Sequence, residues 1–379
     1  MPPTDGSDGQ ALRHGAHLTI DLGAIRENYR RLRARLKGAR CAAVVKADAY
    51  GLGAAQVGPA LAEAGAQDFF VALPCEGLRL REALTETGAG VEPAPRIFIL
   101  SGFETGLGPD FRQAQLIPVL NSLGQVAAWG SEAGDAPLPA ALHLDTGMNR
   151  LGLPPAEAET LAAEPERLAG LEPLLVMSHL ACAEEPDNPM NRAQLDLFQE
   201  LRRGLPPAPA SLANSSGVFL GPDFHFDLAR PGVALYGVNP TPGGPNPMGQ
   251  VVRLQARILQ VREIDAPMTV GYGASFRAAG PARIATVATG YADGYLRSLS
   301  NRGSAFLDGL AAPVVGRVSM DLITLDVTQM PADSVQPGAL VDLIHPQDGL
   351  DRLAEEAGTI GYELLTALGQ RYRRSYLST

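Results

Sequence analysis

The sequence predicts an α/β fold, a (β/α)8 TIM-type barrel followed by a mainly β C-terminal domain, from three observations. Short apolar runs alternate with amphipathic helical patterns through the first two-thirds of the chain. The runs are apolar at consecutive positions, as in parallel strands that are buried on both faces. A Pro- and Gly-rich linker, 239–249, then precedes a part rich in Val, Ile, Leu and Thr. We expect a flexible tail over 1–16, the barrel over 17–245 and the β domain over 250–379.

Eight apolar runs account for the strands of the predicted barrel. Eight strands with interleaved helices are typical of a closed barrel. An open, doubly wound sheet is the alternative, but no Gly-x-Gly-x-x-Gly follows the first run. The predicted strands are Leu18–Leu22, Cys41–Val45, Phe69–Leu73, Arg96–Leu100, Ile117–Leu120, Ala141–Asp145, Leu174–Leu180 and Ser211–Ser215.

Two of the helical patterns between these strands are especially regular. The spacing predicts helices over 24–37 and 191–205, each with one apolar stripe and a charged opposite face. The stripes consist of Ile25, Tyr29, Leu32 and Leu36 in the first helix, and of Leu195, Phe198 and Leu201 in the second.

The part after residue 250 reads as strands bounded by Gly, Pro or Asp, which is typical of a β domain. A final helical pattern, Leu350–Leu368, precedes the basic ending RYRRSYL. The predicted strands are Val251–Val261, Ala282–Thr289, Ala312–Val318, Asp321–Val327 and Ala339–Leu343.

The charge balance argues against two classes of partner. With 31 basic and 41 acidic residues, the formal net charge is −10. Nucleic acids and anionic membranes both favour a basic surface, so we expect neither as a partner. No apolar run approaches the roughly 18 residues that span a bilayer, and the polar start of the sequence does not resemble a secretory signal.

Cysteine and histidine usage fits a cytoplasmic protein without a metal. The three cysteines, Cys41, Cys75 and Cys182, show no Cys-x-x-Cys spacing, which suits a reducing compartment. The six histidines show no His-x-x-x-His pair, so the sequence indicates no metal site.

Any chemistry that needs a primary amine has two side chains to draw on, because the chain holds only Lys37 and Lys46. Lys37 closes an arginine-rich helix and is expected in solvent. Lys46 ends the strand Cys41–Val45, and the C-terminal end of a barrel strand faces the catalytic mouth. Burial there lowers the pKa of an amine, and a neutral amine can form a Schiff base with an aldehyde. On position alone, a strand-end lysine that reaches solvent explains the pattern equally well.

Other candidate residues follow strands in the same way. Arg150 lies in a glycine-containing turn and can bind a carboxylate or phenolate in a bidentate manner, although a surface arginine fits the residue type as well. His179 ends a strand, where a structural histidine is the commoner case. Ser215 lies in the polar turn ANSSG, whose hydroxyls and amides suit a phosphate, while many such turns are plain loops. Gly232 and Val233 follow Arg230 in DLARPGVALYG.

Together these segments resemble the alanine racemases, pyridoxal-phosphate enzymes with a (β/α)8 barrel and a C-terminal β domain. The resemblance extends from about Leu18 to Leu377 and rests on separate motifs in the same order. They are VVKADAYGLG, HLDTGMNRLG, MSHLACAEE, ANSSG, DLARPGVALYG, TVGYGASF, ATGYADGY and GRVSMD. The resemblance implies interconversion of L- and D-alanine, which supplies D-alanine for peptidoglycan, in a homodimer.

The resemblance also implies a role for each matching residue. Lys46 would bind the cofactor and act as the base on the D face, and Tyr272, entering from the partner subunit, would be the base on the L face. Arg230 would face the pyridine nitrogen with a permanent positive charge, and His179 would lie beside the ring, bonded toward Arg230. The phosphate would be held by Tyr50, Ser215, Gly232 and Val233, and the substrate carboxylate by Arg150, Met320 and Asp321, with Tyr291 at the entrance.

The sequence departs from the family pattern at two places. Many members carry a carbamylated lysine that orients the arginine matching Arg150, and His143 stands there instead. We therefore expect no carbamate, and His143, a bound anion or water to orient Arg150. A tyrosine that often contacts the phosphate near the C-terminus is matched by either Gln370 or Tyr372.

Several alternative functions remain at this stage. A broader amino-acid racemase, acting on serine, lysine or arginine, would share these motifs. A barrel decarboxylase is disfavoured by Arg230 and by the lack of a Cys-rich catalytic segment. A non-catalytic pyridoxal-phosphate carrier is disfavoured by the second domain with Tyr272, and a barrel hydrolase is the least specific alternative.

Overall fold

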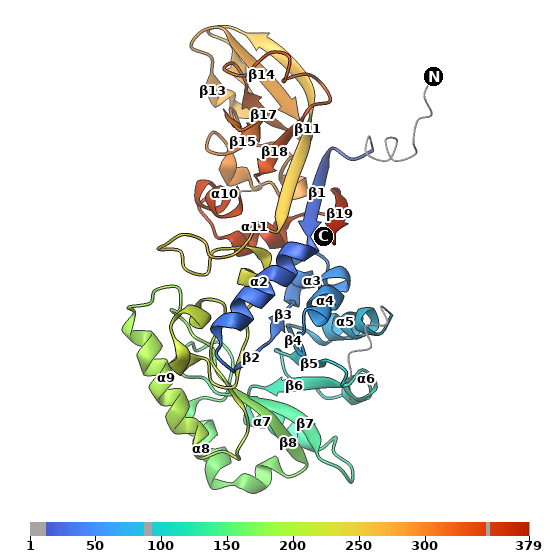
Figure 1. The fold of residues 1–379 in the computed structure, drawn as a ribbon, viewed down its shortest axis with the longest axis vertical. Coiled ribbons are helices and arrows are strands. Elements are labelled where there is room, and N and C mark those ends of the chain that lie inside the picture. The colour runs from blue at the N-terminus through green and yellow to red at the C-terminus, as the bar shows by residue number, and fades with distance from the viewer. Residues whose placement is uncertain (1–12, 87–92, 346–348, 379) are drawn as a thin grey trace. The chain divides into compact units, whose positions relative to one another are not determined.

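The structure, a computed structural model, describes residues 13–86, 93–345 and 349–378. Most of the predicted tail, 1–12, therefore lies outside the described residues. The chain forms two compact units, which we describe separately. One unit is Ile25–Gly249, and the other combines the described parts of 1–24 and 250–379. We call them the barrel unit and the β unit (Figure 1).

The barrel unit is built on a seven-stranded parallel sheet with strand order β3 to β9. Its closing strand, β10 (Leu228–Ala229), pairs in parallel with β2 (Arg40–Cys41). On the other side of β10, the Asp227 and Arg230 amides donate to the carbonyls of Ala210 and Ala213 at 3.0 and 2.8 Å. The strands β3 to β9 are Ala43–Val44, Asp68–Val71, Arg96–Ile99, Leu116–Leu120, Leu138–His143, Leu171–Met177 and Ala210–Ser211. The predicted (β/α)8 architecture is confirmed.

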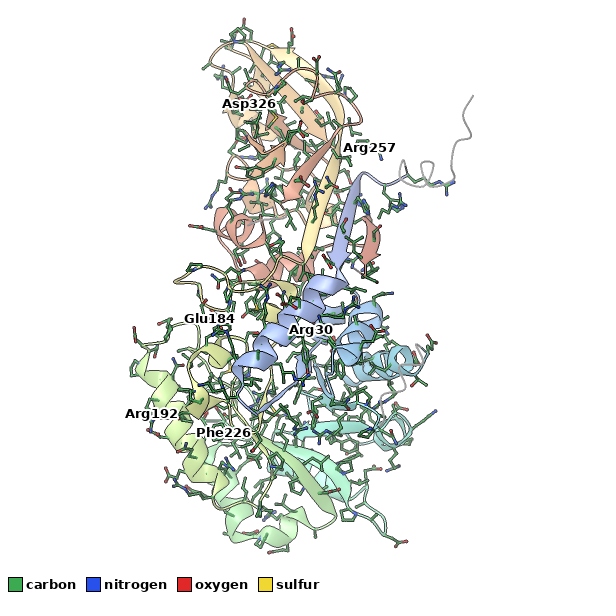
Figure 2. All side chains as sticks on the ribbon, viewed as in Figure 1. Arg30, Glu184, Arg192, Phe226, Arg257 and Asp326 are labelled. Carbon is green, nitrogen blue, oxygen red and sulfur yellow. The ribbon has the colours of Figure 1, made fainter. Side chains whose placement is uncertain are left out.

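The helices of the barrel unit alternate with these strands and bury the expected stripes. Ile25, Tyr29 and Leu32 are at most 1% exposed, and the opposite face of the first helix carries its arginines. Figure 2 shows Arg192 on the outer side of the last helix, whose Phe198 packs edge-on against Phe226. The helices are α2 (Leu22–Arg35), α3 (Lys46–Gly51), α4 (Ala54–Glu63), α5 (Pro74–Glu86), α6 (Gly108–Gln113), α7 (Leu123–Gly130), α8 (Pro155–Ala163) and α9 (Pro189–Arg202).

One predicted barrel strand was wrong. The segment predicted at Leu18–Leu22 is β1 (Ala16–Asp21), which pairs antiparallel with β11 (Val252–Ile264) and parallel with β19 (Arg373–Leu377) in the β unit. Its burial alternates along the strand, as in a sheet with one buried face. The strand that takes its place in the barrel, β10, has only two residues. It is too short to give an apolar run that identifies a strand in the sequence. The carbonyl of Gly15, which we expected in the tail, accepts a hydrogen bond from the Arg257 amide.

The β unit is organised around the long strand β11. Its main sheet has the order β16-β15-β18-β11-β1-β19, and β14 pairs with both β11 and β17 (Figure 1). Four of the five predicted strands closely match β11, β14, β17 and β18, and the fifth partly matches β16. The remaining strands are β12 (Thr269–Val270), β13 (Phe276–Arg277), β14 (Ala282–Val287), β15 (Ser304–Leu307), β16 (Leu310–Pro313), β17 (Ile323–Asp326) and β18 (Leu340–Ile344).

The C-terminal part of the β unit differs from its predicted form in two ways. The predicted helix over 350–368 is two helices, α10 (Gly349–Ala357) and α11 (Gly361–Ala367), because Gly358 adopts φ +69° and ends the first. The basic ending is strand β19 rather than an irregular tail. None of the helices in the described residues is long and apolar enough to span a membrane.

Candidate active site

Lys46 directly follows β3 and Val45 at the C-terminal end of a barrel strand. Burial lowers the pKa of its amine, and the Arg150 guanidinium lowers that pKa further, whereas the Glu76 carboxylate raises it. A larger fraction of the amine is therefore neutral than in an exposed lysine, which is the form that attacks an aldehyde.

The backbone after Lys46 forms a left-handed turn. Ala47, Asp48, Ala49 and Tyr50 have φ between 51° and 55°. Non-glycine residues in this region are strained by roughly 1–2 kcal/mol each. Hydrogen bonds fix both ends: the Ala47 amide donates to Glu76 Oε1 at 2.7 Å, and the Ala54 amide donates to Asp48 Oδ1 at 2.7 Å. The turn fixes the backbone that carries Lys46 and Tyr50.

Tyr50, Ser215 and Gly232 come together in the barrel unit. A methyl group at Gly232 would lie 2.4 Å from the Tyr50 hydroxyl, so only glycine permits this approach. Ser215 Oγ accepts hydrogen bonds from the amides of Gly232 and Ala234 at 2.9 and 3.3 Å. The Tyr50 phenol and the Ser215 hydroxyl proton are donors that suit a phosphate, and the two amides fix the position of Ser215 Oγ. Val233, the remaining predicted phosphate ligand, lies between Gly232 and Ala234 in the sequence, and its side chain is buried.

Arg230 is buried with its guanidinium directed at neutral acceptors. Its Nη1 donates to Ser211 Oγ, and its Nη2 donates to the Ser178 carbonyl at 2.6 Å. Burial lowers the pKa of Arg230 to about 9, so the group keeps its charge at neutral pH. None of the described carboxylates forms an ion pair with it. A permanent cation in this position disfavours protonation of any base placed against it.

His179 lies at the end of β8 near the same cations. Burial first, and then Arg230 and Arg150, hold its pKa well below the ordinary value, so the imidazole is neutral. The Arg230 guanidinium donates to Ser211 and to the carbonyl of Ser178, the residue before His179; a bond between His179 and Arg230 stays a prediction. The buried amide of Gln194 fixes the His179 backbone, since its Nε2 donates to the His179 carbonyl at 2.9 Å.

Arg150 is exposed on a loop that leaves and rejoins β7. The Asp145 carboxylate accepts hydrogen bonds from the Gly147 and Asn149 amides at 2.9 and 3.1 Å. The Leu153 amide donates to the His143 carbonyl at 2.7 Å and closes the loop. The loop thereby presents a guanidinium beside the barrel mouth, where it can bind an anion.

His143 has a defined tautomer. Asn121 Nδ2 donates to the Val119 and Leu100 carbonyls at 2.8 and 3.1 Å, so its Oδ1 must accept from His143 Nδ1, 2.8 Å away. Burial, assisted by Arg230, lowers the pKa of His143 to about 4. The neutral ring therefore carries its proton on Nδ1 and leaves Nε2 as an acceptor.

The β unit holds the other predicted site residues at its surface. Tyr272 lies between Gly271 and Gly273 in a turn after β12 and is 72% exposed. Tyr291 and Met320 are 43% and 54% exposed, and the Tyr291 amide donates to the Ser319 carbonyl at 3.0 Å. Tyr272, Tyr291 and Met320 are thus among the large side chains that the β unit exposes, and Tyr291 and Met320 lie on adjoining segments.

Arg371 joins the segments that carry Tyr291 and Asp321. Its guanidinium donates to Asp293 Oδ1 at 2.6 Å and to Asp321 Oδ1 at 2.7 Å. Next to it, Tyr372 is buried with its hydroxyl 3.4 Å from Thr289 Oγ1, while Gln370 is exposed. Of the two residues that could match the phosphate-contacting tyrosine of the family, Gln370 is therefore the one whose side chain is exposed.

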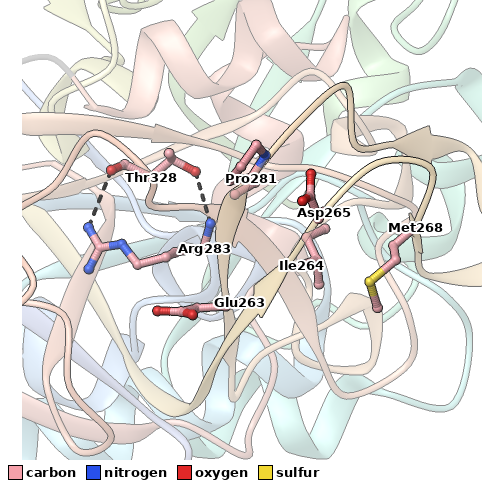
Figure 3. A pocket seen from close by; sticks show the side chains of 8 residues that line it. Glu263, Ile264, Asp265, Met268, Pro281, Arg283 and Thr328 are labelled. Carbon is pink, nitrogen blue, oxygen red and sulfur yellow. Dashed lines mark hydrogen bonds between the residues drawn. The ribbon is translucent and has the colours of Figure 1, made fainter.

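A pocket of about 500 Å³ elsewhere in the β unit contains none of these residues. Figure 3 shows its lining, with Thr328, Arg283 and Glu263 on the left of the view and Asp265 and Met268 on the right. The Arg283 side chain is engaged by backbone carbonyls, including that of Val327. Within the described residues, no group of His, Cys, Asp and Glu side chains could hold a metal ion.

Family models match both parts of the chain. A model of the alanine racemase N-terminal domain matches residues 20–240, and one of the C-terminal domain matches residues 251–376. The chain belongs to the alanine racemase family.

Individual relatives extend this likeness over nearly the whole chain. An alanine racemase from Rhodospirillum rubrum is 52% identical over 97% of both chains, and a catabolic alanine racemase from Mesorhizobium japonicum is 52% identical over 96% of this chain and 93% of its own. The crystal structure of alanine racemase from Bartonella henselae with covalently bound pyridoxal phosphate superposes with a TM-score of 0.90. It is 40% identical and covers 96% of this chain and 99% of its own. The resemblance inferred from the motifs is confirmed.

Sequence reasoning found the alanine racemase motifs but missed the residues that hold them. The residues missed are Glu76, Asn121, Gln194 and Arg371, which belong to no motif that we recognised. Glu76 bonds to the amide next to Lys46, and the other three bond to His143, to the His179 carbonyl and to Asp321. Glu76 alone left a signal, because it lies three residues after the predicted strand Phe69–Leu73, where an acidic residue suits the first turn of a helix such as α5.

Proposed function

We propose that this protein is an alanine racemase that interconverts L- and D-alanine with pyridoxal 5'-phosphate bound to Lys46. The observation that carries the proposal is a half-buried lysine at a barrel strand end, whose pKa is lowered by burial and by Arg150, in the same unit as Tyr50, Ser215 and Gly232. These residues fit the cofactor: an amine for its aldehyde, and hydroxyls for its phosphate. When bound, the cofactor supplies the aldehyde and an electron-withdrawing ring.

The residues of the chain divide the remaining work. Arg150 binds the substrate carboxylate, assisted by Met320 and Asp321, and Tyr291 lines the entrance. Lys46 removes or returns the α-proton on the D face, and Tyr272 does so on the L face, because inversion needs one base on each side of a planar carbon. Arg230 keeps its charge, which limits electron withdrawal and favours rapid return of the proton.

We place the enzyme in the cytoplasm as a homodimer in which Tyr272, Met320 and Asp321 complete the partner's barrel. The 72% exposure of Tyr272 and the exposure of Met320 support the shared site. The three cysteines are free thiols, which supports a reducing compartment. D-alanine would serve peptidoglycan synthesis.

The experiment compares substitutions of the two lysines. Borohydride reduction should attach pyridoxal phosphate to the Lys46 peptide alone. Lys46→Arg should lower racemisation by at least roughly 10²–10⁴-fold, while Lys37→Arg should retain the native rate. Full activity of Lys46→Arg would refute the proposal. Rates on alanine, serine, lysine and arginine would separate alanine racemase from a broader racemase.

A further inference from the structure

Glu76 is the residue outside the motifs that bonds most directly to the segment of Lys46. It lies in the first turn of α5 and its Oε2 accepts hydrogen bonds from the Ala72 and Leu73 amides at 2.7 and 3.1 Å. These two bonds are local and fix the turn between β4 and α5. Such contacts are ordinary for a glutamate near a helix N-terminus.

The third bond of Glu76 is not local. Oε1 accepts the amide of Ala47, 29 residues away, at 2.7 Å. Ala47 is the residue after Lys46 and the first of the left-handed turn. One carboxylate therefore connects the turn after β3 to the turn after β4. The connection is made at Ala47, where the backbone enters the left-handed region that non-glycine residues rarely adopt.

Glu76 is also the negative charge near the amine. Burial and Arg150 lower the pKa of Lys46, and Glu76 raises it. His179 also lies close to Lys46, but its imidazole is neutral because burial holds its pKa low. The balance at Lys46 is therefore set by burial, one guanidinium and one carboxylate.

We propose that Glu76 is a positioning residue for Lys46, fixing the backbone of the left-handed turn through the Ala47 amide and supplying a negative charge that acts on the amine. This role rests on the proposed function only insofar as Lys46 is the reactive lysine. Because Glu76 acts through a backbone amide and through charge, its effect should be measurable on the apoprotein without cofactor or substrate.

The test uses the fact that the chain has only two lysines. The apoprotein is reductively methylated with formaldehyde and cyanoborohydride over a range of pH, and mass spectrometry of the Lys46 and Lys37 peptides gives the titration midpoint of each amine. In Glu76→Gln the Lys46 midpoint should fall by roughly 0.5–1 unit, while that of Lys37 stays constant. Glu82→Gln, at an exposed glutamate of the same helix, is the matched control and should change neither.

A second measurement reports the backbone contact. Hydrogen–deuterium exchange of the 46–53 segment should be faster in Glu76→Ala and Glu76→Gln than in Glu82→Gln. If Glu76→Ala does not fold, Glu76→Gln, which keeps the side-chain volume, decides the question. An unchanged Lys46 midpoint together with unchanged exchange would overturn the proposal. Because neither readout involves the cofactor, failure of the proposed function would be seen separately, in the borohydride experiment.

Discussion

His143 shows how a single buried side chain couples the site to pH. Its pKa is lowered from 6.5 to about 4 in the folded protein, whereas the unfolded chain protonates near the ordinary value. Between these values the unfolded state binds the extra proton, so stability falls as the pH falls from 6.5 toward 4. The full shift corresponds to about 3 kcal/mol.

Removing His143 should therefore flatten this pH dependence. We expect His143→Gln apoprotein to lose less free energy of unfolding than the native chain between pH 6.5 and pH 4, by up to about 3 kcal/mol. Urea unfolding at several pH values measures the difference. Parallel slopes for His143→Gln and the native protein would contradict the assignment.

Arg230 should control which reaction follows proton removal. A carboxylate in its place would favour protonation of a facing pyridine nitrogen and prolong the life of the carbanion. We expect Arg230→Glu to raise the ratio of transamination to racemisation roughly tenfold or more, measured as pyruvate formed per alanine interconverted. Arg230→Lys keeps the charge and should stay near the native ratio. An unchanged ratio in a folded Arg230→Glu protein would refute this role.

At the scale of residues, the sequence pointed to candidate reactive and charged side chains but not to the residues that hold them in place by hydrogen bonds. Lys46, Arg150 and Arg230 could be proposed as site residues from the sequence because they belong to motifs that follow predicted strands. Asn121 and Gln194 could not, since an amide that fixes a neighbour through hydrogen bonds has no composition or period of its own. Nothing in the sequence distinguishes Arg371 from the other arginines, of which the chain has 29. Its bonds to Asp293 and Asp321 depend on the fold.

Among the elements, the left-handed turn after β3 makes a distinct prediction. Ala47 is exposed with φ 51°, so its substitutions test the backbone rather than the packing. Valine is strained in this region more than alanine, while glycine is not strained. We expect Ala47→Val to lower the free energy of unfolding by roughly 1–2 kcal/mol and Ala47→Gly to keep it or raise it slightly, both measured by urea unfolding. Equal stability of the two variants would show that the turn is relaxed.

The predictions of elements succeeded where burial is regular. The helix stripe with Ile25 and Tyr29 has a clear period, and most barrel strands are long enough to give an apolar run. The closing strand β10 was missed because its pairing depends on two residues. The strand β1 was misassigned because an apolar run identifies a strand but not the sheet in which it pairs.

At the scale of the whole molecule, the pairing of β1 decides which residues belong to which unit. β1 belongs with residues 250–378, although it precedes the barrel in sequence. Parallel pairing of β1 with β19 brings together the N- and C-terminal parts of the described chain, a pairing over more than 350 residues that local patterns do not encode. Charge and composition gave only an expectation about the classes of partner, and the topology of the sheets had to come from the structure.

The proposed shared site gives the sharpest test at this scale. If Lys46 acts with Tyr272 of the partner subunit, Lys46→Ala and Tyr272→Phe are each inactive, but a mixed dimer contains one barrel with both native residues. After exchange of subunits at equal concentration, half the dimers are mixed and one of their two sites is intact, so racemisation should recover to about a quarter of the native rate. Lys46→Ala mixed with a Lys46→Ala, Tyr272→Phe double variant has no intact site and should remain inactive. No recovery after proven exchange would mean that both bases come from one chain.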